Sequence, residues 1–133
     1  MAGGAWETVI LGGGPVGLTT ALIAARQGGV LVVLPRQAHA RTPLRIDCVP
    51  VSLLALFIEL GMHPADLGVT TVHHHRLVAW DSAAPHVVSS AGTVHIMRPI
   101  LERRLLEQVR AHRAITIVSG ARVEELPAAG RSS

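Results

Sequence analysis

The chain has 133 residues, of which 49% are hydrophobic and 16% charged, so its composition is that of a folded domain and excludes a disordered polypeptide. The formal net charge is +3, and all twelve basic residues are arginines, spread from Arg26 to Arg131 with almost no aromatic residues beside them. A nucleic-acid-binding surface needs a concentrated basic face or stacking aromatic rings. We therefore expect no nucleic acid partner.

Two further features bear on the compartment. Cys48 is the only cysteine, which excludes an internal disulfide and favours a reducing, cytoplasmic location. We expect it to be buried as a small hydrophobic residue. The uncharged stretch from Thr8 to Ala25 has the length of a signal or membrane segment, but it contains four glycines and a proline, and Glu7 rather than a basic region precedes it. This pattern predicts neither export nor a membrane span.

A strand, a glycine turn and a helix open the fold. Residues 6–11 are predicted to form a strand, and residues 15–27 a helix that ends at Gly28-Gly29. Between them lies Gly12-x-Gly14-x-x-Gly17, which is typical of the entry to a dinucleotide-binding fold. Gly12 lets the chain turn, Gly14 lets the backbone approach a pyrophosphate, and Gly17 lets the helix pack on the strand.

The rest of the chain continues the alternation of strands and helices. Residues 30–34 are a continuous apolar run, as in a buried parallel strand. Prolines at 43 and 50 predict a loop from Pro35 to Pro50. The later predicted elements are a helix over 51–60, two strands over 69–80 and 87–97 that pair antiparallel, and a helix over 99–112 with Leu101, Leu105, Val109 and His112 on one stripe. Short strands are predicted over 115–118 and 123–126.

The sequence therefore predicts an α/β fold. It is a Rossmann-like, three-layer domain with a mostly parallel sheet and a small antiparallel β excursion from about 69 to 97. We expect the domain to span residues 1–127, with residues 128–133 as a disordered tail.

Four stretches, in this order, resemble the front part of flavoproteins of the aromatic-hydroxylase (group A monooxygenase) and flavin-dependent halogenase superfamily. They are Val9-Ile-Leu-Gly-Gly-Gly-Pro-Val-Gly-Leu, Val32-Val-Leu-Pro-Arg36, Leu44-Arg-Ile with Leu53-Leu-Ala-Leu-Phe-Ile-Glu-Leu-Gly61, and Arg98-Pro-Ile-Leu-Glu-Arg-Arg-Leu-Leu106 with Ile115-Thr-Ile-Val118. The resemblance implies an FAD-binding domain of the GR2 type. In such enzymes FAD lies along the first β-α-β unit, NAD(P)H is the reductant, and the reduced flavin reacts with oxygen.

The resemblance also implies which residues hold the cofactor. Its glycine turn would hold the FAD pyrophosphate, and three arginines would lie near the cofactor. The turn residues are Gly12, Gly14, Val16 and Gly17. Arg45 would lie near the pyrophosphate and the flavin entrance, Arg98 would touch the cofactor at the start of a helix, and Arg36 would lie beside the adenosine.

One departure concerns the adenosine ribose. An acidic residue about 20 positions beyond the glycines ordinarily accepts hydrogen bonds from the ribose, but Pro35 occupies that place and no Asp or Glu occurs between Glu7 and Asp47. Arg36 without a neighbouring acid suits the 2′-phosphate of NADP. An NADP-binding module is therefore an alternative to an FAD-binding one.

A second departure concerns the flavin end. The Gly-Asp and Asp-Gly elements of the family have no counterpart, since neither dipeptide occurs, and the substrate domain is lacking. An exposed flavin ring would discharge its oxygen adduct unproductively. We expect a chain that is not catalytically complete alone and that further residues or a partner polypeptide complete. The other alternative is a non-catalytic accessory module that has lost the cofactor.

No catalytic residue is predicted. His73, His74 and His75 suggest a metal ion, but successive residues of a strand point to opposite faces, so only His73 and His75 could share one. We interpret this segment as a polar strand and predict no metal site.

Overall fold

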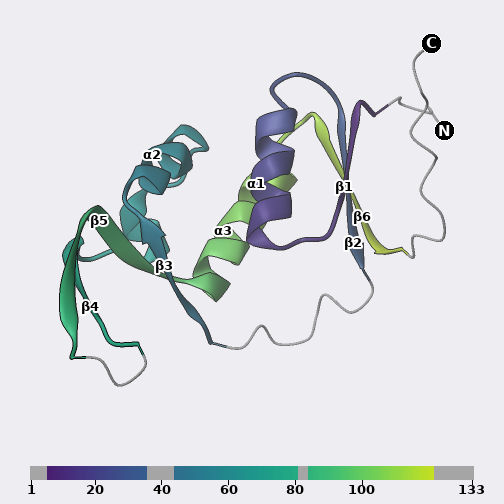
Figure 1. The fold of residues 1–133 in the computed structure, drawn as a ribbon. Helices are drawn as coiled ribbons and strands as arrows, with labels where there is room; N and C mark the ends of the chain where they lie inside the picture. The colour runs from purple at the N-terminus through teal and green to yellow at the C-terminus, as the bar shows by residue number, and fades with distance from the viewer. Residues whose placement is uncertain (1–5, 36–43, 81–83, 122–133) are drawn as a thin grey trace, which may run out of the picture.

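The computed structural model of the chain describes residues 6–35, 44–80 and 84–121. These residues form two three-stranded sheets with helices packed between and beside them (Figure 1). In chain order the elements are β1 (Thr8–Leu11), α1 (Pro15–Ala24), β2 (Val30–Pro35), β3 (Ile46–Pro50), α2 (Ser52–Glu59), the 3-10 helix η1 (Pro64–Leu67), β4 (His73–Val78), β5 (His86–Met97), α3 (Arg98–Ala111) and β6 (Ile115–Ala121).

The first sheet is parallel, with strand order β1-β2-β6 and β2 in the centre. Val32 lies opposite Ile10 on one side and Ile117 on the other. The apolar, β-branched residues of these strands suit a pleated surface that a helix covers. The predicted β-α-β unit and its parallel sheet are confirmed.

Both long helices lie on the same face of the parallel sheet, α1 beside α3 (Figure 1). On that face Val30 and Val32 are completely buried. On the other face Val9 is 53% and Leu11 46% exposed. The predicted α/β fold, with a parallel sheet and a small antiparallel sheet, is confirmed.

The second sheet is antiparallel, with strand order β3-β5-β4. The predicted antiparallel pairing of the two extended stretches before residue 97 is confirmed as β4 with β5. The prediction of a loop up to Pro50 is wrong for Ile46–Pro50, which forms β3 and pairs with β5. Pro50 is tolerated because it ends the strand, where the missing N–H removes little from the ladder.

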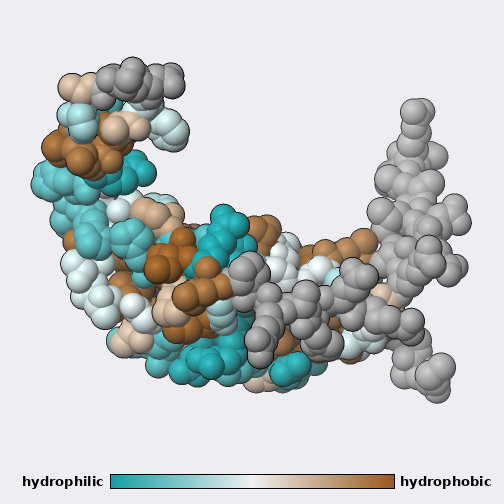
Figure 2. Space-filling view, turned by 90° about the horizontal axis from the view of Figure 1, so that it is seen from below, coloured by the Kyte–Doolittle hydropathy of each residue, from teal (hydrophilic) through white to brown (hydrophobic). Residues whose placement is uncertain are grey.

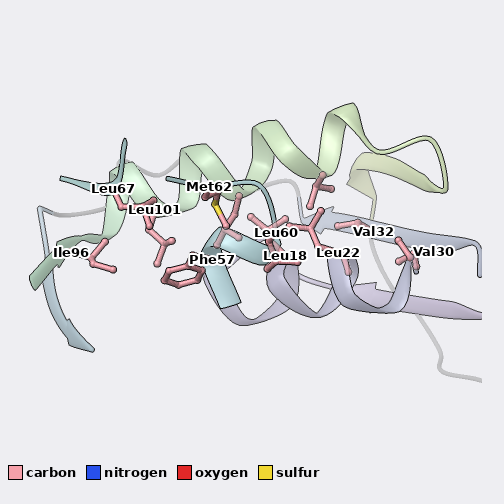
Figure 3. Close-up of a cluster of buried hydrophobic side chains, with 14 of the residues drawn as sticks. Leu18, Leu22, Val30, Val32, Phe57, Leu60, Met62, Leu67, Ile96 and Leu101 are labelled. Atoms are coloured by element: carbon pink, nitrogen blue, oxygen red, sulfur yellow. The ribbon is translucent and has the colours of Figure 1, made fainter. Parts of the chain in front are cut away.

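One hydrophobic core joins the two halves of the chain (Figure 3). Leu18 and Leu22 of α1 meet Val32 of the parallel sheet, and α3 runs along this group. Of the predicted stripe, Leu101, Leu105 and Val109 are buried, whereas His112 is the C-cap residue of α3 and is only half-buried. At the other end the same cluster takes in residues from the antiparallel sheet, α2 and the segment after it. These are Phe57, Leu60, Met62, Leu67, Val94 and Ile96.

No helix among the described residues is long and apolar enough to cross a membrane. The predicted strand over 123–126, the predicted tail over 128–133 and Arg36 lie outside the described residues.

Candidate cofactor-binding site

The glycine turn after β1 has the steric features that the spacing predicts. Gly12 has φ of +112°, a conformation that residues with a Cβ rarely adopt, and its N–H donates to the carbonyl of Val33 across the sheet at 2.9 Å. A Cβ at Gly17 would lie 2.9 Å from the carbonyl oxygen of Gly12 and 3.3 Å from Cγ2 of Ile10. The close packing of α1 on β1 therefore requires glycine at position 17.

Gly14 differs from these two glycines because nothing crowds it. It is the N-cap residue of α1, with φ −76° and ψ 171°, and a Cβ built there meets no described atom within 4 Å. No side chain caps the helix, and its first turn holds no acidic residue. The first N–H groups of a helix lack intrahelical partners and carry a partial positive charge. The turn thus combines open space with the end of a helix that attracts anions.

A second cluster contains two of the predicted arginines. Arg45 Nε donates to Oδ1 of Asp47 at 2.8 Å, and Arg98 Nε donates to Oδ2 of the same carboxylate at 2.6 Å. The backbone N–H of Arg98 also donates to the carbonyl of Arg45 at 2.8 Å. We call the three residues Arg45, Asp47 and Arg98 the arginine clamp.

The strand register explains why these three residues meet. Asp47 of β3 lies opposite Ile96 of β5, and Ile46 lies opposite Met97. The next positions along the two strands are Arg45 and Arg98, which the backbone bond joins. Because residues two apart in a strand share a face, Asp47 lies beside Arg45 and diagonally across from Arg98.

The carboxylate of Asp47 offsets an unfavourable placement of charge. Arg98 is the first residue of α3, where a cation opposes the helix dipole, and it lies next to a second guanidinium. The hydrogen bond from Arg98, followed by the charges of Arg98 and Arg45, lowers the pKa of Asp47, against the opposing effect of desolvation. The hydrogen bond to Asp47 likewise raises the pKa of Arg98. The three residues of the clamp carry a net charge of +1, and the carboxylate of Glu102 nearby also raises the pKa of Arg98.

The glycine turn and the arginine clamp lie at the same end of the molecule. The parallel strands all run toward the lower end of Figure 1, and α1 and α3 both start there. Ligands of open α/β sheets bind outside the carboxyl ends of the strands. Figure 2 views the molecule from this end, where hydrophilic and hydrophobic residues are interspersed over its body and the antiparallel sheet extends to the left.

The structure describes Pro35 and Val16 of the predicted site but not Arg36. Pro35 ends β2, as the spacing predicts, so the position of the missing acid is at the carboxyl end of that strand. Val16 is 81% exposed in the first turn of α1. Arg36, the predicted neighbour of the adenosine, lies outside the described residues.

Two side-chain expectations outside the turn also have outcomes. The prediction that Cys48 is buried is wrong, because it lies on the exposed face of β3 opposite His95. His73 and His75 lie in β4, and the ring of His73 contacts that of His95 with centroids 4.9 Å apart. Among residues 6–35, 44–80 and 84–121 no three His, Cys, Asp or Glu side chains are arranged to hold a metal ion.

Sequence reasoning missed the role of Asp47. The available signal was the spacing Arg45-x-Asp47, which places both side chains on one face if the segment is extended. Because the segment was predicted to be a loop, the spacing did not indicate that the two side chains share a face. The approach of Arg98 depends on the pairing of β3 with β5, which the local sequence does not reveal.

Comparison with known proteins rests on solved structures, because neither a scan against protein-family models nor a search of curated proteins gives a match. PqsL of Pseudomonas aeruginosa, a probable FAD-dependent monooxygenase, is 20% identical with a TM-score of 0.70, over 95% of this chain and 36% of its own. The p-nitrophenol 4-monooxygenase PnpA of Pseudomonas putida DLL-E4 is 17% identical with a TM-score of 0.66, over 86% of this chain and 32% of its own.

A third similar structure contains the cofactor. The flavin-dependent monooxygenase PieE, solved with FAD and substrate, is 23% identical with a TM-score of 0.63, over 87% of this chain and 24% of its own. The chain spans about a third or less of the length of these proteins. At such identities the similarity is one of fold, and the chain has the fold of a part of the flavin-dependent monooxygenases.

Proposed function

We propose that this chain is the FAD-binding part of a flavin-dependent oxidoreductase of the monooxygenase type, with a Rossmann-type nucleotide site at its first glycine turn. The observation that carries the proposal is the open space at Gly14 beside the uncapped start of α1. A diphosphate fits this place because backbone N–H groups and the helix dipole both favour an anion there. Gly12 and Gly17 give the turn its shape, and the exposed Val16 lies in the first turn of the helix.

The arginine clamp adds positive charge at the same end of the molecule. Arg45 and Arg98 retain N–H donors beyond those that Asp47 accepts, and guanidinium groups match phosphate geometry. We assign both to the FAD phosphates and the adjoining part of the cofactor. Arg36 follows β2 in the sequence and is assigned to the adenosine end.

When bound, FAD would supply the redox chemistry, with NAD(P)H as the reductant. The residues of this chain bind and orient the diphosphate. Among the residues that the structure describes, we assign no side chain to proton transfer. We therefore propose that further residues or a partner polypeptide complete the catalyst, in the cytoplasm.

Pro35 bears on the strength of binding. A carboxylate at the end of β2 would accept charge-assisted hydrogen bonds worth about 1.5–3 kcal/mol each from the ribose hydroxyls. Its replacement by proline predicts an FAD affinity at least about tenfold lower than a site with the acid. The same position motivates the NADP-binding alternative and the alternative of a module that has lost its cofactor.

The test is a titration of the purified chain with FAD, followed by flavin absorbance and fluorescence. We expect saturable binding to the wild type and binding weaker by about tenfold or more in Gly14→Ala, whose added methyl group fills the space for the diphosphate. Since φ at Gly14 suits alanine and no described atom is near, the variant should unfold at the same temperature as the wild type.

Two results would contradict the proposal, and they separate the alternatives. Thermal stabilisation by NADP without any by FAD would favour an NADP-binding module, because a ligand stabilises the state that binds it. A colourless protein that neither nucleotide stabilises would favour the non-catalytic module.

A further inference from the structure

We infer that Asp47 is a positioning residue for the diphosphate site: it fixes the guanidinium groups of Arg45 and Arg98 so that their terminal amino groups remain available to one anionic ligand. The inference rests on the proposed function and adds a role that follows from the contacts of Asp47. It predicts that removal of a negative charge weakens the binding of an anion.

In the arginine clamp, each arginine donates to Asp47 through Nε and not through its two terminal Nη groups. Each oxygen of Asp47 accepts one hydrogen bond, and in both cases the donor is Nε, at 2.8 Å from Arg45 and 2.6 Å from Arg98. A guanidinium has five N–H donors in a fixed fork. With Nε on the carboxylate, the edge that carries the two Nη groups keeps the paired geometry that binds phosphate oxygens.

The clamp also restrains side chains that would otherwise be mobile. Arg45 is 63% exposed along its side chain, and Arg98 29%, whereas Asp47 is 16% exposed. A long exposed side chain loses conformational entropy when a ligand immobilises it. Because Asp47 already holds both arginines, that loss is incurred on folding and not on binding.

Charge balance supports the same role. Without Asp47, two guanidinium groups would lie side by side at the start of α3, and repulsion would separate them. With Asp47 the pair keeps a net charge of one cation and a single geometry. An attraction that depended on charge alone would instead improve when Asp47 is neutralised.

The experiment compares FAD binding by the wild type, Asp47→Asn and Asp66→Asn in the whole chain. Asp66 also pairs with an arginine, Arg104 at 3.5 Å, and its neutralisation changes the net charge by the same amount at another place. We expect about tenfold weaker binding in Asp47→Asn, the effect of one lost charge-assisted contact. Asp66→Asn should bind as the wild type does or slightly more tightly.

A second measurement tests, in the absence of FAD, whether Asp47 holds the two arginine side chains. In ¹⁵N–¹H spectra, the Nε–H signals of Arg45 and Arg98 should be protected from exchange in the wild type and in Asp66→Asn, and unprotected in Asp47→Asn. Asp47→Glu, which restores a carboxylate, should recover part of the FAD affinity. This rescue separates positioning from a general effect on folding.

The outcomes distinguish the two levels of the proposal. A wild-type chain that binds FAD while Asp47→Asn binds it equally well or better would overturn the role of Asp47 alone. Unprotected Nε–H signals in the wild type would overturn it as well. A wild-type chain that binds no FAD would overturn the proposed function and the positioning role with it.

Discussion

Asp47 and Arg98 are 51 residues apart in the sequence, yet Oδ2 of one lies 2.6 Å from Nε of the other. The contact fixes the start of α3 against β3, in addition to the backbone bond between Arg98 and Arg45. α3 packs in turn on α1, the helix that begins at the glycine turn. The position of the arginine clamp is thus linked to that of the turn through two packed helices.

The first prediction is a pH dependence of stability that belongs to this contact. The hydrogen bond from Arg98 lowers the pKa of Asp47 below its ordinary value of 3.8, so the folded state binds the proton less well than the unfolded state. The stabilisation is therefore fully present above the unfolded pKa and is lost as the pH falls through the lower, folded value. In urea unfolding, the free energy of unfolding of the wild type should exceed that of Asp47→Asn, and the difference should be larger at about pH 7 than at about pH 3.

The NMR signal of the Asp47 carboxylate tests whether Arg98 is what lowers the pKa of Asp47. In NMR titrations Arg98→Gln should raise the pKa of Asp47 toward 3.8. A titration midpoint that does not move, or a stability difference that is the same at both pH values, would contradict the assignment to Arg98.

The second prediction concerns the packing of α1 on β1. In Gly17→Ala the new Cβ would lie 2.9 Å from the carbonyl oxygen of Gly12, a backbone atom of a tight turn that has little freedom to shift. We expect a loss of about 1–3 kcal/mol in the free energy of unfolding. Gly14→Ala is the matched control, since the same methyl group meets no described atom within 4 Å there. Equal thermal midpoints for the two variants would show that the helix does not approach the strand this closely.

The third prediction tests whether α3 forms the shared core of both sheets. Leu105 is completely buried, so Leu105→Ala should cost about 2–5 kcal/mol of unfolding free energy. Leu77 in β4 is 71% exposed, and Leu77→Ala should change stability by less than about 0.5 kcal/mol. Chemical denaturation of both variants measures these losses in the free energy of unfolding. Similar losses at the two positions would contradict the placement of Leu105 in the core and of Leu77 on the surface.

The part of the fold that the sequence predicted is the part that local patterns determine. The glycine turn, the apolar run of β2 and the stripe of Leu101, Leu105 and Val109 each depend on residues that are close in the chain. Their periods and turn residues are therefore visible without any partner. The same is true of Gly12 and Gly17, whose backbone conformation and close contact follow from their positions in the turn.

The part that was missed depends on distant partners. β3 is only five residues long and ends in proline, and it is a strand because β5 pairs with it. Asp47 becomes the centre of a cluster only through that pairing. A short segment with two nearby prolines looks like a loop when its partner, more than 40 residues away, is not considered.

The fourth prediction follows from the correction at Cys48. Because β3 is a strand with one face in solvent, Cys48 is exposed opposite His95 and not buried. The folded protein should therefore react with about one equivalent of a thiol reagent such as Ellman's reagent without denaturant, since exposure governs access to the sulfur. Cys48→Ser should not react and should unfold at the same temperature as the wild type, because an exposed side chain contributes little to packing. A thiol that reacts only in denaturant would mean that this face of β3 is covered. Cys48 would then be buried, as is common for free cysteines.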